Sequence, residues 1–100
     1  MHSYNIVYLD LALEDVADIK KYLSGFYPGT WPRFADKLER SISGLSAMPY
    51  ICETWQPKPA YRRLVVDKYL VFYKVLDAEK TVQIHRILHG SRDIQRFLNF

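Results

Sequence analysis

Three runs of strand-forming residues follow one another closely in the last forty residues, and this spacing constrains the fold more than any other feature. Residues 61–66, 69–76 and 81–89 are rich in Val, Ile, Leu, Phe and Tyr. Two residues separate the first run from the second, and four separate the second from the third. Connections this short are typical of consecutive antiparallel hairpins, so the pattern predicts a three-stranded meander.

A further strand and a first helix are predicted ahead of the meander. Residues 4–9 have low polarity on both faces, which indicates a strand that is covered on both sides. Asp10 is the expected N-cap of the helix, and Gly25 and Pro28 end it. Apolar residues recur at helical spacing at Ala12, Val16, Ile19, Leu23 and Phe26.

A second helix is predicted from Thr30, its expected cap, up to Pro49. Pro32 is tolerated in the first turn, because the N–H that it lacks has no helical partner there. The two helices, joined by a short Pro-Gly turn, indicate a helical hairpin. The apolar stripe of the second helix consists of Trp31, Phe34, Leu38, Leu45 and Met48, with Ile42 at its edge.

The remaining segments are predicted as a loop and a short helix. Residues 50–60 are expected to form a loop, because Pro57 and Pro59 cannot donate a hydrogen bond to a strand ladder. Ser91 is a candidate cap for a helix over residues 92–98.

The expected fold class is α+β, with a single domain over residues 1–100 and the element order β-α-α-β-β-β followed by a short C-terminal helix. An antiparallel sheet of about four strands packs on the helical hairpin, and its other face is partly open. Residues 4–9 add at an edge of the sheet or beside its last strand.

Composition excludes several classes of protein. Hydrophobic residues make up 49% of the 100 residues and charged residues 25%, which is ordinary globular usage and excludes intrinsic disorder. The single cysteine, Cys52, excludes an internal disulfide and a cysteine-cluster zinc site. A net charge of +3 is compatible with a nucleic-acid surface or an acidic partner. Without a signal-peptide pattern or an apolar run of roughly 20 residues, we expect a cytoplasmic protein that contacts no membrane.

His85 and His89 are the first candidates for chemistry. On a strand, residues four apart share one face but lie about 13 Å from each other, which is too far for both to bind one metal ion. We therefore expect no metal site and no cofactor. The two histidines are either polar strand residues that face solvent, or one of them supplies acid–base catalysis, since imidazole titrates near neutrality.

Arginines and lysines provide the other candidates. Arg86 is predicted to share a strand face with Val82, Ile84 and Leu88, where its stem packs on apolar neighbours or its head lines a phosphate-binding hollow. The basic residues of the second half form either a solvated surface or an RNA-binding ring around Trp55, Tyr61, Tyr69 and Tyr73. These basic residues are Lys58, Arg62, Arg63, Lys68, Arg86, Arg92 and Arg96.

The order and spacing of several segments resemble the RelE/ParE family of toxins from type II toxin–antitoxin modules. The segments are residues 61–66 (YRRLVV), 69–75 (YLVFYKV) and 84–93 (IHRILHGSRD), together with the Ala12–Asp15–Ile19 stretch and Met48-Pro49. The resemblance implies a compact antiparallel sheet under a helical pair, and an acidic antitoxin that wraps the toxin in a hetero-oligomer. It also implies one of two activities: RelE-like members cut mRNA on the ribosome, and ParE-like members inhibit DNA gyrase.

The resemblance assigns roles to individual residues. Arg92 matches a basic catalytic position of the RelE-like members, and His85 and His89 are candidates for proton transfer. Lys58, Arg62, Arg63 and Arg86 are the candidate contacts to RNA or to a partner protein. Leu70 stands where RelE-like nucleases commonly carry Arg, and Phe97 and Phe100 occupy a tail in which those enzymes have a catalytic Tyr or His.

Three hypotheses follow from these assignments. The first is a metal-independent endoribonuclease, the second is a non-enzymatic gyrase inhibitor, and the third is a partner-binding domain without toxicity. In the second, Arg92 and Asp93 have a structural role and anchor the C-terminal helix.

Overall fold

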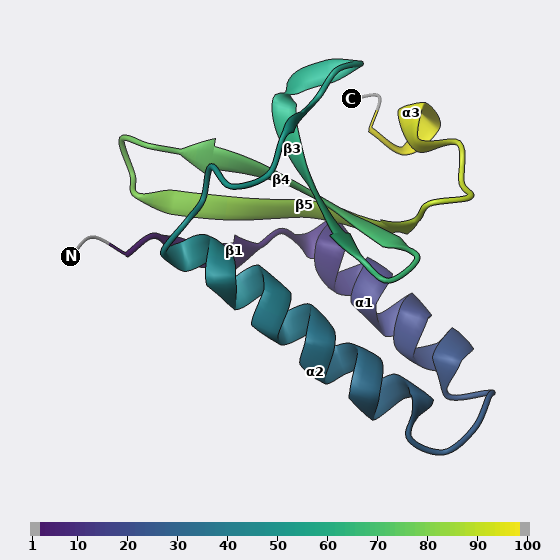
Figure 1. Cartoon of the computed structure of the whole chain (residues 1–100). Helices are drawn as coiled ribbons and strands as arrows, with labels where there is room; N and C mark the ends of the chain where they lie inside the picture. Colours follow the sequence, from purple (N-terminus) through teal and green to yellow (C-terminus); the bar gives the residue numbers. More distant parts are fainter. Residues whose placement is uncertain (1–2, 99–100) are drawn as a thin grey trace.

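A computed structural model of the chain describes residues 3–98. One sheet carries two long helices on one face and a short helix on the other (Figure 1). In chain order the elements are β1 (Asn5–Tyr8), α1 (Asp10–Leu23), α2 (Thr30–Ser43), the 3-10 turn η1 (Gly44–Ser46), β2 (Thr54–Trp55), β3 (Lys58–Val66), β4 (Tyr69–Leu76), β5 (Thr81–His89) and α3 (Ile94–Phe97).

The sheet has five strands in the order β1-β5-β4-β3-β2. The meander is confirmed, because β3, β4 and β5 pair antiparallel, and β4 and β5 have the predicted bounds. The prediction of about four antiparallel strands is wrong in two respects. A fifth strand, β2, extends the sheet, and β1 runs parallel to β5, with Asn5 opposite Thr81 and Tyr8 opposite Ile84.

The predicted loop over residues 50–60 contains β2 and the start of β3. Trp55 pairs with Lys58, so Pro57 lies in the tight turn between the two strands. A register shift follows between Thr54 and Trp55, and Pro59 falls in the irregular stretch opposite it. Proline occurs in sheets at edges and bulges of this kind, so the prolines restrict the pairing without preventing it.

Both helices begin without the predicted caps. Leu9 is the N-cap residue of α1 and Gly29 that of α2, and neither helix start has a side-chain cap hydrogen bond. Asp10 and Thr30 are instead the first helical residues. At α3 the N-cap residue is Asp93 rather than Ser91.

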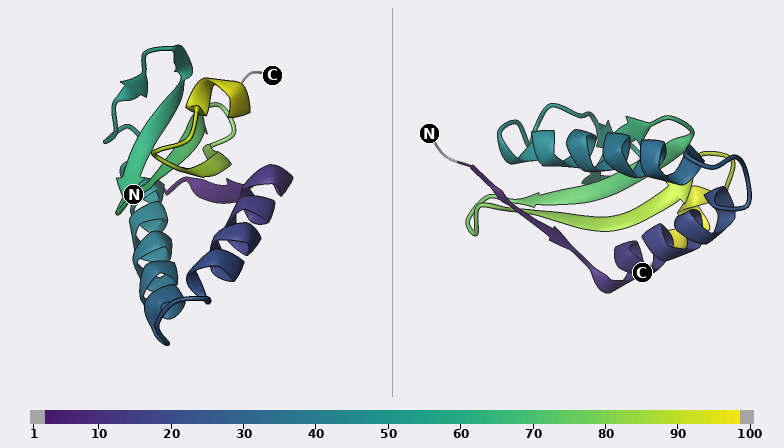
Figure 2. Two further views of the ribbon diagram at one scale, coloured as in Figure 1. Left: turned by 90° about the vertical axis from the view of Figure 1, so that its right-hand side faces the viewer. Right: turned by 90° about the horizontal axis from the view of Figure 1, so that it is seen from below.

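The two long helices cover the sheet without packing closely along their length. Figure 2 shows that α1 and α2 meet at their connection, residues 24–29, and diverge toward the sheet. Helix α1 packs on β5 and α2 on β3. The expected helical hairpin is therefore a splayed pair whose helices depend on the sheet for their packing. Phe26 and Met48, predicted for the two apolar stripes, lie outside the helices and are exposed, whereas Ile42 is fully buried.

Two hydrophobic clusters lie on opposite faces of the sheet. On the helix-covered face, Tyr73 and Ile84 pack with side chains of α1 and α2. On the other face, α3 and the β2–β3 hairpin cover a smaller cluster of Tyr61, Phe72, Leu88 and Leu98. At β1 the prediction of two covered faces is wrong, because Asn5 and Val7 point to the open side and are exposed.

Candidate functional site

A bulge in β5 decides which side chains reach each face of the sheet. Phe72 of β4 pairs with Arg86, but its neighbour Tyr73 pairs with Ile84, so His85 is an extra residue. After the bulge, the alternation of β5 side chains between the two faces of the sheet is therefore offset by one residue from the alternation before it. The prediction that Arg86 shares a face with Val82 and Ile84 is wrong for this reason.

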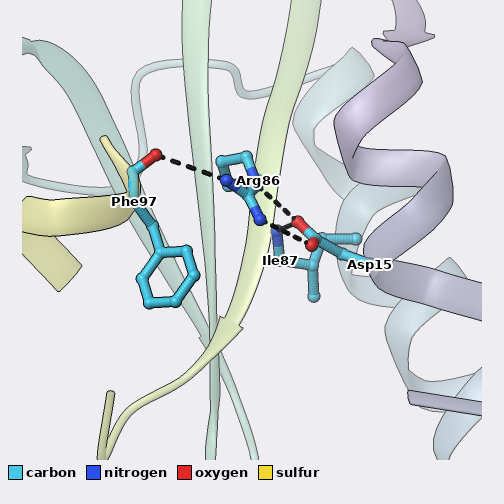
Figure 3. Close-up of polar contacts among 4 residues, drawn as sticks. All are labelled: Asp15, Arg86, Ile87 and Phe97. Carbon is cyan, nitrogen blue, oxygen red and sulfur yellow. Dashed lines mark hydrogen bonds and ion pairs between the residues drawn. The ribbon is translucent and has the colours of Figure 1, made fainter. Parts of the chain in front are cut away.

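Beyond the bulge, the unpaired edge of β5 is closed by a carboxylate from α1. Strand β1 pairs with β5 only as far as Ile84. The backbone N–H of Ile87 donates to Asp15 Oδ2 at 2.9 Å, and Arg86 Nε and Nη2 donate to the two oxygens of Asp15 at 2.8 Å each (Figure 3). The hydrogen bonding of the guanidinium to the Asp15 carboxylate, which accepts, raises the pKa of Arg86, so this guanidinium stays charged.

Arg86 also connects this ion pair to the C-terminal helix. Its Nη1 donates to the carbonyl of Phe97 at 3.3 Å, and its guanidinium lies 5.4 Å from the centre of the Phe97 ring (Figure 3). Arg92 lies 5.2 Å from the same ring. Arg86 therefore joins α1, β5 and α3, and each of its three guanidinium nitrogens donates a hydrogen bond within the protein.

A groove opens beside this ion pair, between α1 and the end of β5. It has a volume of about 450 Å³ and is lined by Asp15, Asp18, Tyr22, Tyr69, Arg86, His89, Ser91, Arg92 and Phe97, among others. The groove brings three of the predicted site residues together, namely Arg86, His89 and Arg92. It is a mixed polar and aromatic surface that suits a polar or acidic ligand better than a purely apolar one.

His89 is fixed at the rim of this groove. Its Nδ1 accepts a hydrogen bond from the backbone N–H of Ser91 at 3.1 Å and lies 2.7 Å from Ser91 Oγ. Its ring packs edge-on against that of Tyr69, with 5.2 Å between the ring centroids. A backbone N–H can only donate, so Nδ1 must be the acceptor. The neutral imidazole therefore carries its proton on Nε2.

The prediction that the two histidines share one face of the strand is wrong, because the bulge places His85 on the opposite face of the sheet from His89. The His85 ring packs edge-on against Tyr61 at 5.1 Å, within the α3 side of the molecule, and its Nε2 lies 3.1 Å from Gln83 Oε1. Burial lowers the pKa of His85, and the nearby charge of Lys74 lowers it further. Lys74 in turn lies 4.8 Å from the centre of the Tyr61 ring.

The remaining predicted residues are distributed over both faces. Arg62 donates from Nη1 to the carbonyl of Cys52 at 2.5 Å and lies 4.9 Å from the centre of the Tyr50 ring, on the helix-covered face. Arg63 pairs with Phe72, which places it on the α3 side, where it is exposed. Lys58 begins β3 opposite Trp55. These three residues lie outside the groove that His89 and Arg92 line.

Asp15 lines the groove but was not among the site residues predicted from the sequence. Its signal was present, because an acidic residue stands between Ala12 and Ile19 on the apolar stripe of α1 and is itself buried. Its partner Arg86 is 71 residues away in the sequence, and no local pattern connects the two. Of the two aromatic walls of the groove, Tyr69 was predicted only as part of a candidate RNA-binding ring, and Tyr22 was not predicted as a site residue.

Residues 3–98 contain neither a candidate metal site nor a candidate membrane-spanning helix. No group of three or more His, Cys, Asp or Glu is arranged to hold a metal ion in this part of the chain. None of the helices described has the length and apolar character that a membrane span requires.

Comparison with known proteins identifies the family. No curated protein matches the chain. Among solved structures, a chromosomal ParDE system from P. aeruginosa is similar, with a TM-score of 0.74 and 16% identity over 89% of this chain and 98% of that one. The toxin–antitoxin complex RelBE2 of Mycobacterium tuberculosis gives 0.67 and 21% over 92% and 97%, and the intact E. coli RelBE complex gives 0.60 and 15% over 90% and 100%.

The family model that describes the ParE toxin of the type II toxin–antitoxin system parDE matches residues 6–94. This match spans nearly all of the described chain, including the ion pair and every residue that lines the groove except Phe97. The chain belongs to the ParE toxin family of type II toxin–antitoxin systems.

Proposed function

We propose that this toxin acts by binding its target, DNA gyrase, and that it has no hydrolytic centre of its own. The observation that carries the proposal is the position of the two histidines on opposite faces of the sheet, His85 beside Tyr61 and His89 beside Tyr69. Both gyrase and the ribosome are cytoplasmic targets, so we place the toxin in the cytoplasm.

Cleavage of RNA requires a base for the 2′-hydroxyl, an acid for the leaving oxygen and cations on the phosphate, all within reach of one another. A single phosphate cannot contact both histidines across the sheet. Arg86, the most deeply placed of the candidate phosphate contacts, is occupied by Asp15 and Phe97. Leu70, where RelE-like nucleases commonly carry Arg, packs against the apolar α3-side cluster.

The cognate partner in this proposal is an acidic antitoxin in a toxin–antitoxin hetero-oligomer. Three of the similar structures are toxin–antitoxin systems or complexes. The positive net charge of this chain, +3, favours an acidic partner.

Ribosome-dependent mRNA cleavage is the second candidate, and one observation favours it. The five strands carry no Asp or Glu. On the sheet face opposite the long helices, the cations therefore have no acidic residue beside them on a neighbouring strand. Arg63, Lys74 and His85 lie on that face. Such a face is compatible with a phosphate backbone.

The test compares purified wild-type toxin with the double variant His85→Gln/His89→Gln, after circular dichroism has shown that both are folded. We expect both proteins to inhibit gyrase supercoiling of a relaxed plasmid to within about twofold, since neither imidazole performs a reaction. We also expect mRNA 5′ ends to remain unchanged in cells that express either protein. New mRNA 5′ ends that disappear with the double variant would establish RNA cleavage instead and overturn the proposal.

A further inference from the structure

Positive and negative charges are separated between the two parts of the chain. Residues 1–53 carry five Lys and Arg against seven Asp and Glu, whereas residues 54–100 carry nine against four. The long helices α1 and α2 belong to the acidic part, and strands β2 to β5 belong to the basic part. The sheet side of the molecule is therefore the side that attracts a polyanion.

The acidic residues of the basic part lie outside its strands, in turns or just ahead of α3. They are Asp67, Asp77, Glu79 and Asp93. Asp67 pairs with Lys37 of α2. Asp77 accepts a hydrogen bond from the Tyr4 hydroxyl and lies 3.9 Å from Lys80 Nζ. These two carboxylates are engaged at the ends of the sheet, so they do not offset the cations in the middle of it.

Two of those cations, Arg63 and Lys74, lie on the sheet face away from the long helices. Arg63 pairs with Phe72, and Lys74 follows Phe72 by two residues, so Arg63 and Lys74 are diagonal neighbours with Cα atoms about 7–8 Å apart. Lys74 Nζ lies 4.8 Å from the centre of the Tyr61 ring. None of the ion pairs formed within residues 3–98 involves Arg63 or Lys74. Two cations this close can contact neighbouring phosphates of one nucleic-acid strand.

The elements that flank this face add positive charge. The β2–β3 hairpin and α3 both rise from the side of the sheet away from α1 and α2 (Figure 1). Lys58 begins β3 in the hairpin, and Arg96 lies in α3. Neither β2, β3 nor α3 contains an acidic residue. Both flanks therefore favour the same polyanionic ligand as the centre of the face.

We infer that this face, with Arg63 and Lys74 at its centre, binds the phosphate backbone of the DNA that gyrase holds. The inference rests on the proposed function, and it adds a contact to the DNA beside the contact to the enzyme. DNA is the polyanion present at that target. His89 lies on the opposite side of the sheet, so the face brings only one of the two histidines to a bound phosphate, which suits binding better than cleavage.

The first experiment measures binding of full-length toxin to a short fluorescein-labelled DNA duplex by fluorescence anisotropy at several salt concentrations. We expect Arg63→Gln and Lys74→Gln each to weaken binding about five- to tenfold at 0.1 M salt. Each should also lower the slope of log affinity against log salt by about 0.9, because each removes one phosphate contact. Lys74→Arg keeps the cation and should bind within about twofold of wild type.

Matched controls make the same charge change on the helix side. Lys20→Gln on α1 and Arg40→Gln on α2 each remove one exposed cation, and both should leave the affinity and the salt slope unchanged. Circular dichroism checks that every variant is folded. The inference is overturned if the toxin binds no duplex, or if the face variants bind as the controls do. Single-stranded RNA that binds about tenfold or more tightly than the duplex would assign the face to RNA and would also overturn it.

A second experiment separates this inference from the proposed function. We expect the double variant Arg63→Gln/Lys74→Gln to need about fivefold or more toxin than wild type for half-maximal inhibition of gyrase supercoiling. If the double variant inhibits as wild type does, the proposed function stands and the inference fails. If the toxin binds the duplex through this face but does not inhibit gyrase, the DNA-binding face stands and the proposed target fails.

Discussion

At the scale of single residues, one carboxylate connects three parts of the molecule. Asp15 of α1 accepts two hydrogen bonds from Arg86 and one from the backbone N–H of Ile87, and Arg86 reaches on to the carbonyl of Phe97 (Figure 3). The side chains of Asp15 and Arg86 are only 9% and 13% exposed. A buried ion pair of this kind adds little net stability over an apolar pair, but loss of one partner leaves a charge buried without compensation.

We therefore expect Asp15→Ala to lower the free energy of unfolding by about 3–5 kcal/mol, measured by urea denaturation. The double variant Asp15→Ala/Arg86→Met should recover a large part of this loss, because it removes the buried charge as well as its partner. Asp36→Ala is the control, since its pair with Arg40 is 65% and 76% exposed and should contribute less than about 0.5 kcal/mol. A loss below about 1 kcal/mol at Asp15 would show that the ion pair does not hold these elements together.

At the scale of secondary-structure elements, strands bounded by short polar turns could be predicted, and so could the place of β1 at the sheet edge beside the last strand, but the parallel direction of β1 and the bulge in β5 could not. The bounds of β4 and β5 follow from a local pattern of apolar runs and connections. The parallel pairing of β1 depends on contacts with residues more than 70 positions away. The bulge at His85 leaves no local signal, and it moves Arg86 and His89 to faces that alternation does not predict. The fold class was therefore readable from the sequence, whereas the faces of the site residues were not.

The start and end of α2 provide a matched pair of glycine substitutions. Gly29, at the N-cap, has φ of 93°, a left-handed conformation that strains an L-residue, although a Cβ there would meet no atom within 4 Å. Gly44, at the C-cap, has φ of −61° and is equally open. We expect Gly29→Ala to destabilise by about 1–2 kcal/mol, and Gly44→Ala to stabilise by about 0.4–1 kcal/mol through the lower entropy of its unfolded chain. Thermal or urea unfolding measures both, and equal effects of the same sign would contradict the backbone argument.

At the scale of the whole molecule, one sheet separates two hydrophobic clusters but also joins them. The helix-covered cluster includes Tyr73 and Ile87, and the α3-side cluster includes their sequence neighbours Phe72 in β4 and Leu88 in β5. A strand cannot leave one cluster and remain ordered in the other. The groove and the ion pair lie where α1, β5 and α3 meet, so their geometry depends on both clusters.

This shared sheet predicts a single cooperative unfolding transition, and the chain carries a natural probe on each side. Trp31 packs against the helix-covered cluster and Trp55 against the α3-side cluster, where its ring lies 5.2 Å from that of Phe72. The chain has two tryptophans, so Trp31→Phe leaves fluorescence from Trp55 alone, and Trp55→Phe leaves it from Trp31 alone. In each variant we expect the urea midpoint from fluorescence to coincide with that from far-ultraviolet circular dichroism, as two-state unfolding requires. If the Trp55 signal were lost at lower urea than the ellipticity while the Trp31 signal followed it, the α3-side cluster would be a separate unit, and the ion pair between Asp15 and Arg86 would not transmit stability across the sheet.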